Sequence, residues 1–185
     1  MSEVAEPSRL ASRMVHDGRI VKLSVDTVRF PDGSEGELEM IRHPGASAVL
    51  PVVGSLEDED PEVVILRQYR YAGGGYIYEV PAGLPDGPDE SWEACAHREL
   101  EEETGFRAGT LIPLTRILTT PGFTDEVIHL FVGTDLTQGE SRLDDDEFVE
   151  VIRLPFSEVV EMVRRGEIVD CKSVATILFA AAFVL

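Results

Sequence analysis

The sequence predicts an α/β sandwich preceded by a small antiparallel sheet. Segments with the apolar pattern of strands are interleaved with segments of helical pattern, an order typical of helices packed on both faces of a sheet. The chain has 185 residues, 43% of them hydrophobic, and can therefore bury one well-packed core. Two strand-like segments around the turn Pro31-Asp32-Gly33 precede this core. We therefore expect a sheet within residues 1–43 and a sandwich domain at residues 44–185.

Glycine, proline and acidic loops separate the expected strands. The N-terminal sheet should contain strands at residues 18–28 and 37–41. A sheet this small needs a covering surface, which the sandwich or a second subunit could supply. The sandwich should contain strands at residues 46–53, 63–69, 76–80, 111–118, 127–133 and 150–154.

Capping residues predict three helices. Asp89 or Ser91 should begin the first helix, and Ser157 should cap the second. The apolar run at residues 173–185 is too short to span a bilayer, so we expect the last helix to dock on the core. The helices should cover residues 92–104, residues 157–165, and the chain from residues 170–173 onward.

The charge balance argues against one class of partner. The formal net charge is −19 and the pI is about 4.4, whereas proteins that hold nucleic-acid backbones carry patches of Lys and Arg. We therefore expect no nucleic-acid partner. A small dianionic substrate can still bind where a metal and a few arginines neutralise it.

Cysteine usage and the N-terminus indicate the compartment. Cys95 and Cys171 are too few for a disulfide framework, and we expect both to be buried thiols in a reducing environment. Residues 1–7 carry acids where a secretory signal would begin with basic residues. The sequence therefore predicts a cytoplasmic protein with no membrane partner.

Carboxylates crowd the end of the helix expected at residues 92–104. At about 100° per residue, Glu99, Glu102 and Glu103 continue the apolar stripe of that helix. Buried carboxylates lose hydration, and anions near a helix C-terminus oppose its dipole, so a cation should compensate them. Arg98 can pair with Glu102 at i, i+4, which leaves Glu99 and Glu103 without a local partner. The shared face favours a divalent cation with oxygen ligands, most simply Mg²⁺, over a solvated surface run.

The stretch that begins at Gly83 resembles the Nudix box, the signature of hydrolases that split nucleoside diphosphates linked to another group. Six residues, 84–89, follow Gly83 where the usual pattern has five, so we expect an altered loop and an unchanged set of helix positions. The resemblance implies an α/β/α sandwich with a mixed sheet, and structural roles for Gly83, Glu90, Arg98 and Gly105. The matching positions are Gly83, Glu90, Arg98, Glu99, Leu100, Glu102, Glu103, Gly105 and Phe106.

Residues 67–83 are similar to the approach to this box in ADP-ribose pyrophosphatases. In that subgroup the second arginine of the tetrapeptide at residues 67–70 meets substrate phosphate or ribose, which implies that Arg70 binds substrate. Pro121, 16 positions past Gly105, matches a proline of the subgroup. Glu39 matches a strand acid that contacts adenosine in relatives. Leu38 stands where a tryptophan that stacks on adenine is familiar, and Phe30 could replace it.

The resemblance also implies roles for the carboxylates. The Ala82 carbonyl with Glu99, Glu102 and Glu103 would hold Mg²⁺, or Mn²⁺. Glu103 and Glu147 are the expected catalytic residues, with Glu147 as the general base at the end of an acidic loop. Within that loop Asp144, Asp145 and Asp146 remain alternative bases.

Together these residues predict metal-dependent hydrolysis of the pyrophosphate bond of ADP-ribose, to AMP and ribose 5-phosphate, or of a related nucleoside diphosphate sugar. Two alternatives remain. One is a pyrophosphatase for GDP-mannose or another nucleotide sugar, and the other is a non-catalytic Nudix-fold sensor of ADP-ribose. In relatives the N-terminal sheet is exchanged between subunits to complete the substrate pocket, so we also expect a homodimer.

Overall fold

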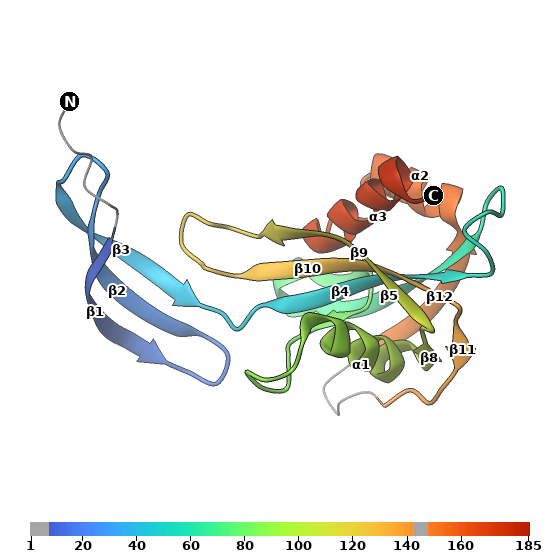
Figure 1. Ribbon diagram of the computed structural model, residues 1–185, viewed down its shortest axis with the longest axis horizontal. Helices are drawn as coiled ribbons and strands as arrows, with labels where there is room; N and C mark the ends of the chain where they lie inside the picture. Colours follow the sequence, from blue (N-terminus) through green and yellow to red (C-terminus); the bar gives the residue numbers. More distant parts are fainter. Residues whose placement is uncertain (1–7, 143–147) are drawn as a thin grey trace. The chain divides into compact units, whose positions relative to one another are not determined.

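The computed structural model describes residues 8–142 and 148–185, which group into two compact units (Figure 1). The N-terminal unit contains residues 8–44 together with 118–127. The body contains residues 45–117 and the described residues from 128 onward. The division expected from the sequence, at residues 43 and 44, stays a prediction.

The N-terminal unit holds a three-stranded antiparallel sheet in the order β1-β2-β3. Its strands are β1 (Ser8–Asp17), β2 (Lys22–Arg29) and β3 (Glu35–Arg42). The sequence predicted only the last two, and it wrongly extended one of them through a turn in which the Gly18 amide donates to the Val21 carbonyl at 2.9 Å. Every residue of β1 is exposed, so its sequence carries no apolar alternation that would have revealed it.

Polar contacts surround a buried carboxylate in the N-terminal unit. Asp26 is buried and accepts hydrogen bonds from the Ser12 hydroxyl at 2.6 Å and the Ser24 hydroxyl at 3.1 Å. It also forms an ion pair with Arg42. The other end of the Arg42 guanidinium pairs with Asp125 at 3.0 Å, which ties residues 118–127 to the sheet.

The body is built on a seven-stranded mixed sheet. Its main path runs β12-β5-β4-β10-β9, with β6 paired to β5 and β7 paired to β4. β4 and β10 are parallel, whereas β5 is antiparallel to β4, β6 and β12. The strands are β4 (Ala46–Val53), β5 (Glu62–Arg70), β6 (Gly75–Glu79), β7 (Ala82–Gly83), β9 (Thr110–Leu118), β10 (Val127–Thr134) and β12 (Val149–Pro155).

Short elements connect these strands. The one-turn helix η1 (Tyr71–Gly73) joins β5 to β6, and β8 (Phe106–Arg107) pairs with β11 (Thr137–Gln138) beside the end of the first helix. Two-residue strands leave no periodic pattern, which is why β7, β8 and β11 were not predicted.

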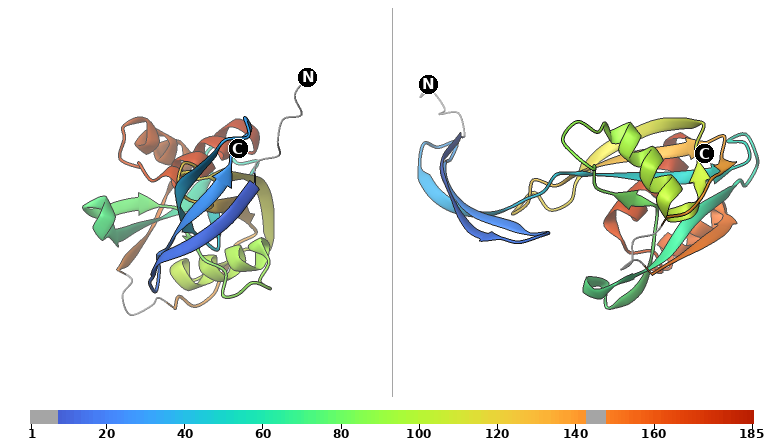
Figure 2. Two further views of the ribbon diagram at one scale, coloured as in Figure 1. Left: turned by 90° about the vertical axis from the view of Figure 1, so that its left-hand side faces the viewer. Right: turned by 90° about the horizontal axis from the view of Figure 1, so that it is seen from below.

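Helices cover both faces of the sheet, as the sequence predicted. α1 (Trp92–Thr104) lies on one face, and α2 (Phe156–Arg164) and α3 (Cys171–Phe183) lie on the other (Figures 1 and 2). The alternation along β4 feeds both layers, because Leu50 packs in the core with α2 and α3 whereas Val49 packs with Leu100 of α1. These two apolar cores fix the α/β/α arrangement.

The helix ends test the capping predictions. Ser91 caps α1 by accepting from the Ala94 amide at 3.1 Å, and Gly105 ends it in the left-handed conformation with φ 73°. Asp170 caps α3 in the same way, accepting from the Ser173 amide at 3.0 Å. The predicted cap of α2 was wrong. Ser157 lies inside that helix, and both its amide and its hydroxyl donate to the distant Asp60, at 2.9 and 2.7 Å.

Two smaller expectations concern the cysteines and membranes. Cys95 is a buried free thiol, but Cys171 is exposed, contrary to the prediction, because the first turn of α3 turns Ser173 inward instead. Burial raises the pKa of the Cys95 thiol to about 11, so it stays protonated at neutral pH. Among the described residues, no helix has both the length and the apolar character needed to cross a bilayer.

Candidate active site

The turn between β6 and α1 is anchored to the central sheet. The Pro81 carbonyl accepts from the Val49 amide at 2.9 Å, and β7 continues the contact by pairing with the start of β4. The side chain of Glu103 reaches back from α1 to this turn, where it accepts from the Ala82 amide at 2.9 Å. Only 3% of Glu103 is exposed, so its carboxylate is held against the turn away from bulk water.

Glu99 reaches the same turn from one helical turn earlier. A Cβ atom added to Gly83 would lie 2.1 Å from the Glu99 carboxyl carbon. The glycine therefore leaves the space that this carboxylate occupies, a close approach that no larger residue permits without moving the acid. Glu99 and Glu103 thus converge on residues 82–83 from one face of α1.

Arg98 organises the remaining box residues. Its guanidinium donates to both oxygens of Glu90 at 3.0 Å each, and to the Leu84 carbonyl at 2.7 Å. Glu90 in turn accepts from the Asp86 amide at 2.8 Å, so the six-residue loop at 84–89 is held at Leu84 by Arg98 and at Asp86 by Glu90. The hydrogen bond with Arg98 holds the pKa of Glu90 below its ordinary value, and the bonds to Glu90, Glu102 and Glu99 raise the pKa of Arg98.

The expected lack of partners for Glu99 and Glu103 was wrong. The Nη1 atom of Arg98 donates to Glu99 at 2.8 Å as well as to Glu102 at 2.9 Å, and Glu103 accepts from the backbone of the turn. Within residues 8–142 and 148–185, no three His, Cys, Asp or Glu side chains are grouped as a metal site would require. The donor chemistry still suits a hard divalent cation, because carboxylate oxygens of Glu99 and Glu103 come from one helix face to one turn.

Arg70 lies at the end of β5, with 42% of its side chain exposed. Its Nε and Nη2 atoms donate to one oxygen of the buried Glu79, at 3.0 and 2.9 Å. Burial alone would lower the pKa of Arg70, but the hydrogen bond that Arg70 donates to Glu79 and the nearby charges of Glu79, Glu103 and Asp170 raise it. Arg70 is therefore a permanent cation within the electrostatic range of Glu103.

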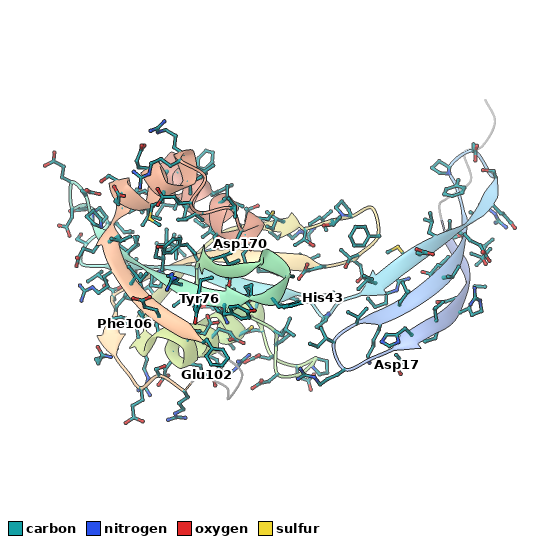
Figure 3. The ribbon with its side chains drawn as sticks, turned by 180° about the vertical axis from the view of Figure 1, so that it is seen from behind. Asp17, His43, Tyr76, Glu102, Phe106 and Asp170 are labelled. Carbon is teal, nitrogen blue, oxygen red and sulfur yellow. The ribbon has the colours of Figure 1, made fainter. Side chains whose placement is uncertain are left out.

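The sequence reading missed Glu79 and Lys172. Glu79 is 4% exposed, and its second oxygen binds the Lys172 ammonium at 3.1 Å. Lys172 pairs at the same time with Asp170 at 2.9 Å. The available signal was a single acid in the apolar strand at residues 76–80, and a lysine that is one of only two in the chain. Figure 3 labels Asp170 at the start of α3 and Glu102 on α1.

The remaining expected site residues belong to the N-terminal unit or lie outside the described residues. Glu147 lies outside the described residues, together with Asp144, Asp145 and Asp146. Glu39 is exposed on β3 of the N-terminal unit, opposite Val25. Phe30 lies over Gly36, where an added Cβ would come within 2.7 Å of its ring. The roles expected for these residues stay predictions.

Comparison with known proteins identifies the family. A family model described as the NUDIX domain matches residues 47–172, which contain the turn, α1 and the Arg70–Glu79 pair. This chain belongs to the Nudix family. A methanol dehydrogenase activator of Bacillus methanolicus is 37% identical over 182 residues, covering 97% of this chain and 95% of the relative. An ADP-ribose pyrophosphatase of Bacillus subtilis (strain 168) is 35% identical over 176 residues, covering 94% of this chain and 92% of the relative.

The fold of this Nudix chain is also found in a solved structure. A crystal structure of an ADP compounds hydrolase superposes with a TM-score of 0.81 at 22% sequence identity, covering 99% of this chain and 96% of the other. The likeness confirms the predicted Nudix-type sandwich with its additional N-terminal sheet. The family and its relatives make the chain a Nudix pyrophosphohydrolase.

Proposed function

We propose that this Nudix enzyme hydrolyses the pyrophosphate bond of ADP-ribose, or of a closely related nucleoside diphosphate sugar, with Mg²⁺ as its metal. The observation that carries the proposal is the convergence of Glu99 and Glu103 on the turn at residues 82–83, beside the cation of Arg70. The full-length similarity to an ADP-ribose pyrophosphatase supports the choice of substrate.

The residues would divide the work between metal and substrate. Glu99, Glu102, Glu103 and the Ala82 carbonyl would hold Mg²⁺, or Mn²⁺ in its place. When bound, such an ion neutralises phosphate charge and lowers the pKa of a coordinated water. Arg70 has five N–H donors, and those not used by Glu79 would hold a phosphate oxygen.

The base proposed for the reaction is Glu147, which would accept a proton from the attacking water. A bond forms between the water oxygen and one phosphorus atom as the bond from that phosphorus to the bridging oxygen breaks. With ADP-ribose the products are AMP and ribose 5-phosphate.

A substrate panel tests the proposal. The purified chain with Mg²⁺ is incubated with ADP-ribose, GDP-mannose, NADH and diadenosine polyphosphates, and initial rates are compared. We expect ADP-ribose to be cleaved fastest and chelation of divalent ions to abolish turnover. GDP-mannose as the fastest substrate would favour the alternative supported by related GDP-mannose pyrophosphatases, and binding of ADP-ribose without cleavage would indicate a sensor.

Variants of α1 provide the matched control. Glu99→Gln and Glu103→Gln should each lower kcat by about 10²-fold or more, because each removes a charged oxygen ligand. Glu93→Gln changes an exposed glutamate at the start of the same helix and should leave kcat unchanged. Equal rates for all four proteins would contradict the assigned site.

Activation of a dehydrogenase is a second candidate function. The relative from Bacillus methanolicus is named a methanol dehydrogenase activator, and its similarity extends over 97% of this chain. The test is to add the chain and Mg²⁺ to purified methanol dehydrogenase and to measure the rate of alcohol oxidation. A rate that does not rise would exclude this candidate for that enzyme.

We further propose a cytoplasmic homodimer that uses the N-terminal unit as its interface, with no nucleic-acid partner. Free thiols at Cys95 and Cys171 agree with a reducing compartment. Sedimentation measured over a range of protein concentrations should show a dimer, and a monomer at every concentration would contradict the proposal. The apolar side chains offered by this unit, each at least 40% exposed, are Leu10, Met14, Val15, Ile20, Val21, Leu38, Leu118 and Phe123.

A further inference from the structure

The first turn of α3 is fastened to the strand that leads into the active-site turn. The Ser173 hydroxyl accepts from the Val80 amide at 2.9 Å and donates to Asp170 at 2.6 Å. Asp170 is also the N-cap of α3. The start of this helix is therefore fixed relative to residues 79–82, although 93 positions separate Ser173 from Val80 in the sequence.

Glu79 joins this helix start to Arg70. One of its oxygens binds the Arg70 guanidinium at 2.9 Å, and the other binds the Lys172 ammonium at 3.1 Å. Exposure is 4% for the Glu79 side chain and 12% for Lys172, so this carboxylate is held between two cations with little access to water. Asp170 supplies the second negative charge, and the four side chains form a neutral network.

Without Lys172, one Glu79 oxygen would lose the cation that fixes its direction. A carboxylate held at one oxygen can rotate, and the long, half-exposed side chain of Arg70 would move with it. The same segment ends at Ala82, whose amide binds Glu103. The places of the phosphate-binding cation and of a metal-binding carboxylate thus depend on the same four residues, 79–82.

We propose that Lys172 is a positioning residue, which orients Glu79 and through it fixes the Arg70 guanidinium on the substrate phosphate. The inference rests on the proposed function, because it assigns Arg70 to the phosphate. It predicts that Lys172 contributes to catalysis only while Arg70 is present.

A double-mutant cycle tests this dependence. The values of kcat and KM for ADP-ribose with Mg²⁺ are measured for the wild type, Lys172→Met, Arg70→Ala and the double variant. Lys172→Met should lower kcat/KM by about 10- to 100-fold, as loss of a residue that orients a site ligand commonly does. In the Arg70→Ala background the same change should alter kcat/KM by less than about twofold. Lys172→Arg, which keeps the cation, should restore most of the activity.

The other lysine of the chain is the control. Lys22 is 56% exposed in the N-terminal unit, and Lys22→Met should leave kcat/KM unchanged. Lys172→Gln is carried through the same cycle as a second variant, so that the result does not depend on Lys172→Met folding.

Additive losses in the cycle, or failure of Lys172→Arg to restore activity, would overturn the inference and leave the proposed function standing. A wild-type protein that neither cleaves nor binds ADP-ribose would overturn both. If Lys172→Met lowers kcat/KM in the wild type but causes no further loss in Arg70→Ala, both the inference and the proposed function are supported.

Discussion

The two units of this chain differ in the side chains that they bury. In the body the buried side chains are mainly apolar, with Leu50, Ile65 and Leu130 among those fully buried. In the described part of the N-terminal unit the buried residues are Ser24 and Asp26. The body is therefore stabilised by transfer of apolar surface from water, whereas the sheet is organised around one carboxylate. We expect the two units to respond oppositely to the same kinds of substitution.

The largest contrast should come from truncating one leucine in each unit. Leu50→Ala removes a fully buried side chain and should lower the free energy of unfolding of the body by about 2–5 kcal/mol. Leu38→Ala changes a leucine that is 40% exposed in the N-terminal unit, and should change stability by about 0.5 kcal/mol or less. Urea unfolding of each variant measures both values. Equal losses would show that Leu38 is buried in solution, either in an apolar core of the N-terminal unit or in the proposed dimer interface, and sedimentation of the variant would distinguish the two.

The reverse contrast should come from Asp26. Asp26→Ala leaves Ser12, Ser24 and Arg42 without their shared acceptor, and should destabilise the N-terminal sheet by about 1–3 kcal/mol. Hydrogen exchange of the amides of β1 to β3 should accelerate, while amides of the body stay protected. Glu37→Ala, at an exposed position of β3, is the control. Unchanged hydrogen exchange in Asp26→Ala would show that Asp26 and its polar partners do not stabilise the N-terminal sheet.

Gly83→Ala should separate activity from stability within the body. The added methyl would meet the Glu99 carboxylate, so the acid must move while the apolar core is untouched. We expect kcat to fall about tenfold or more, with little change in the unfolding midpoint. Gly87→Ala is the matched control, because a Cβ at that glycine meets nothing within 4 Å. Similar kinetics for both variants would show that the position of Glu99 is not critical.

The smallest effect concerns acid. The hydrogen bond from Ser12 is the largest cause that lowers the pKa of Asp26 below its ordinary value, and Ser24 and Arg42 add to it against the effect of burial. The unfolded chain then binds the proton first as pH falls, so stability from this group is complete above about pH 4 and is lost as pH falls through the lower folded pKa. The protection factors of amides in the N-terminal sheet, which correct for the pH dependence of intrinsic exchange, should therefore fall in acid, and Asp26→Asn should weaken that dependence. An identical acid response in Asp26→Asn would assign it to other carboxylates.

The same difference between the units explains which elements the sequence could predict. The strands and helices of the body bury one face each, so their periodicity is visible, and the α1 boundaries follow from Ser91 and Gly105. Strand β1 is exposed along its whole length and has no such pattern. Its place depends on contacts with β2 that become visible only in the folded chain.

The candidate site divides in a similar way. The box residues could be expected because their spacing on one helix is fixed, and Arg70 was expected from the resemblance of residues 67–83 to ADP-ribose pyrophosphatases. Glu79 and Lys172 could not, because their contact joins β6 to α3 across the fold. The cap of α2 failed for the same reason, since Asp60 acts on Ser157 from another loop. Glu147 as the base stays a prediction.

The close approach of Gly83 and Glu99 should also restrict which residues homologous sequences carry at these two positions. A side chain at position 83 would occupy the space of the carboxylate at position 99, so substitutions at the two positions should depend on each other. Among homologous sequences we expect a bulkier residue at position 83 to coincide with a shorter acid at position 99, and a lineage that gains only the first change to lose its selective advantage.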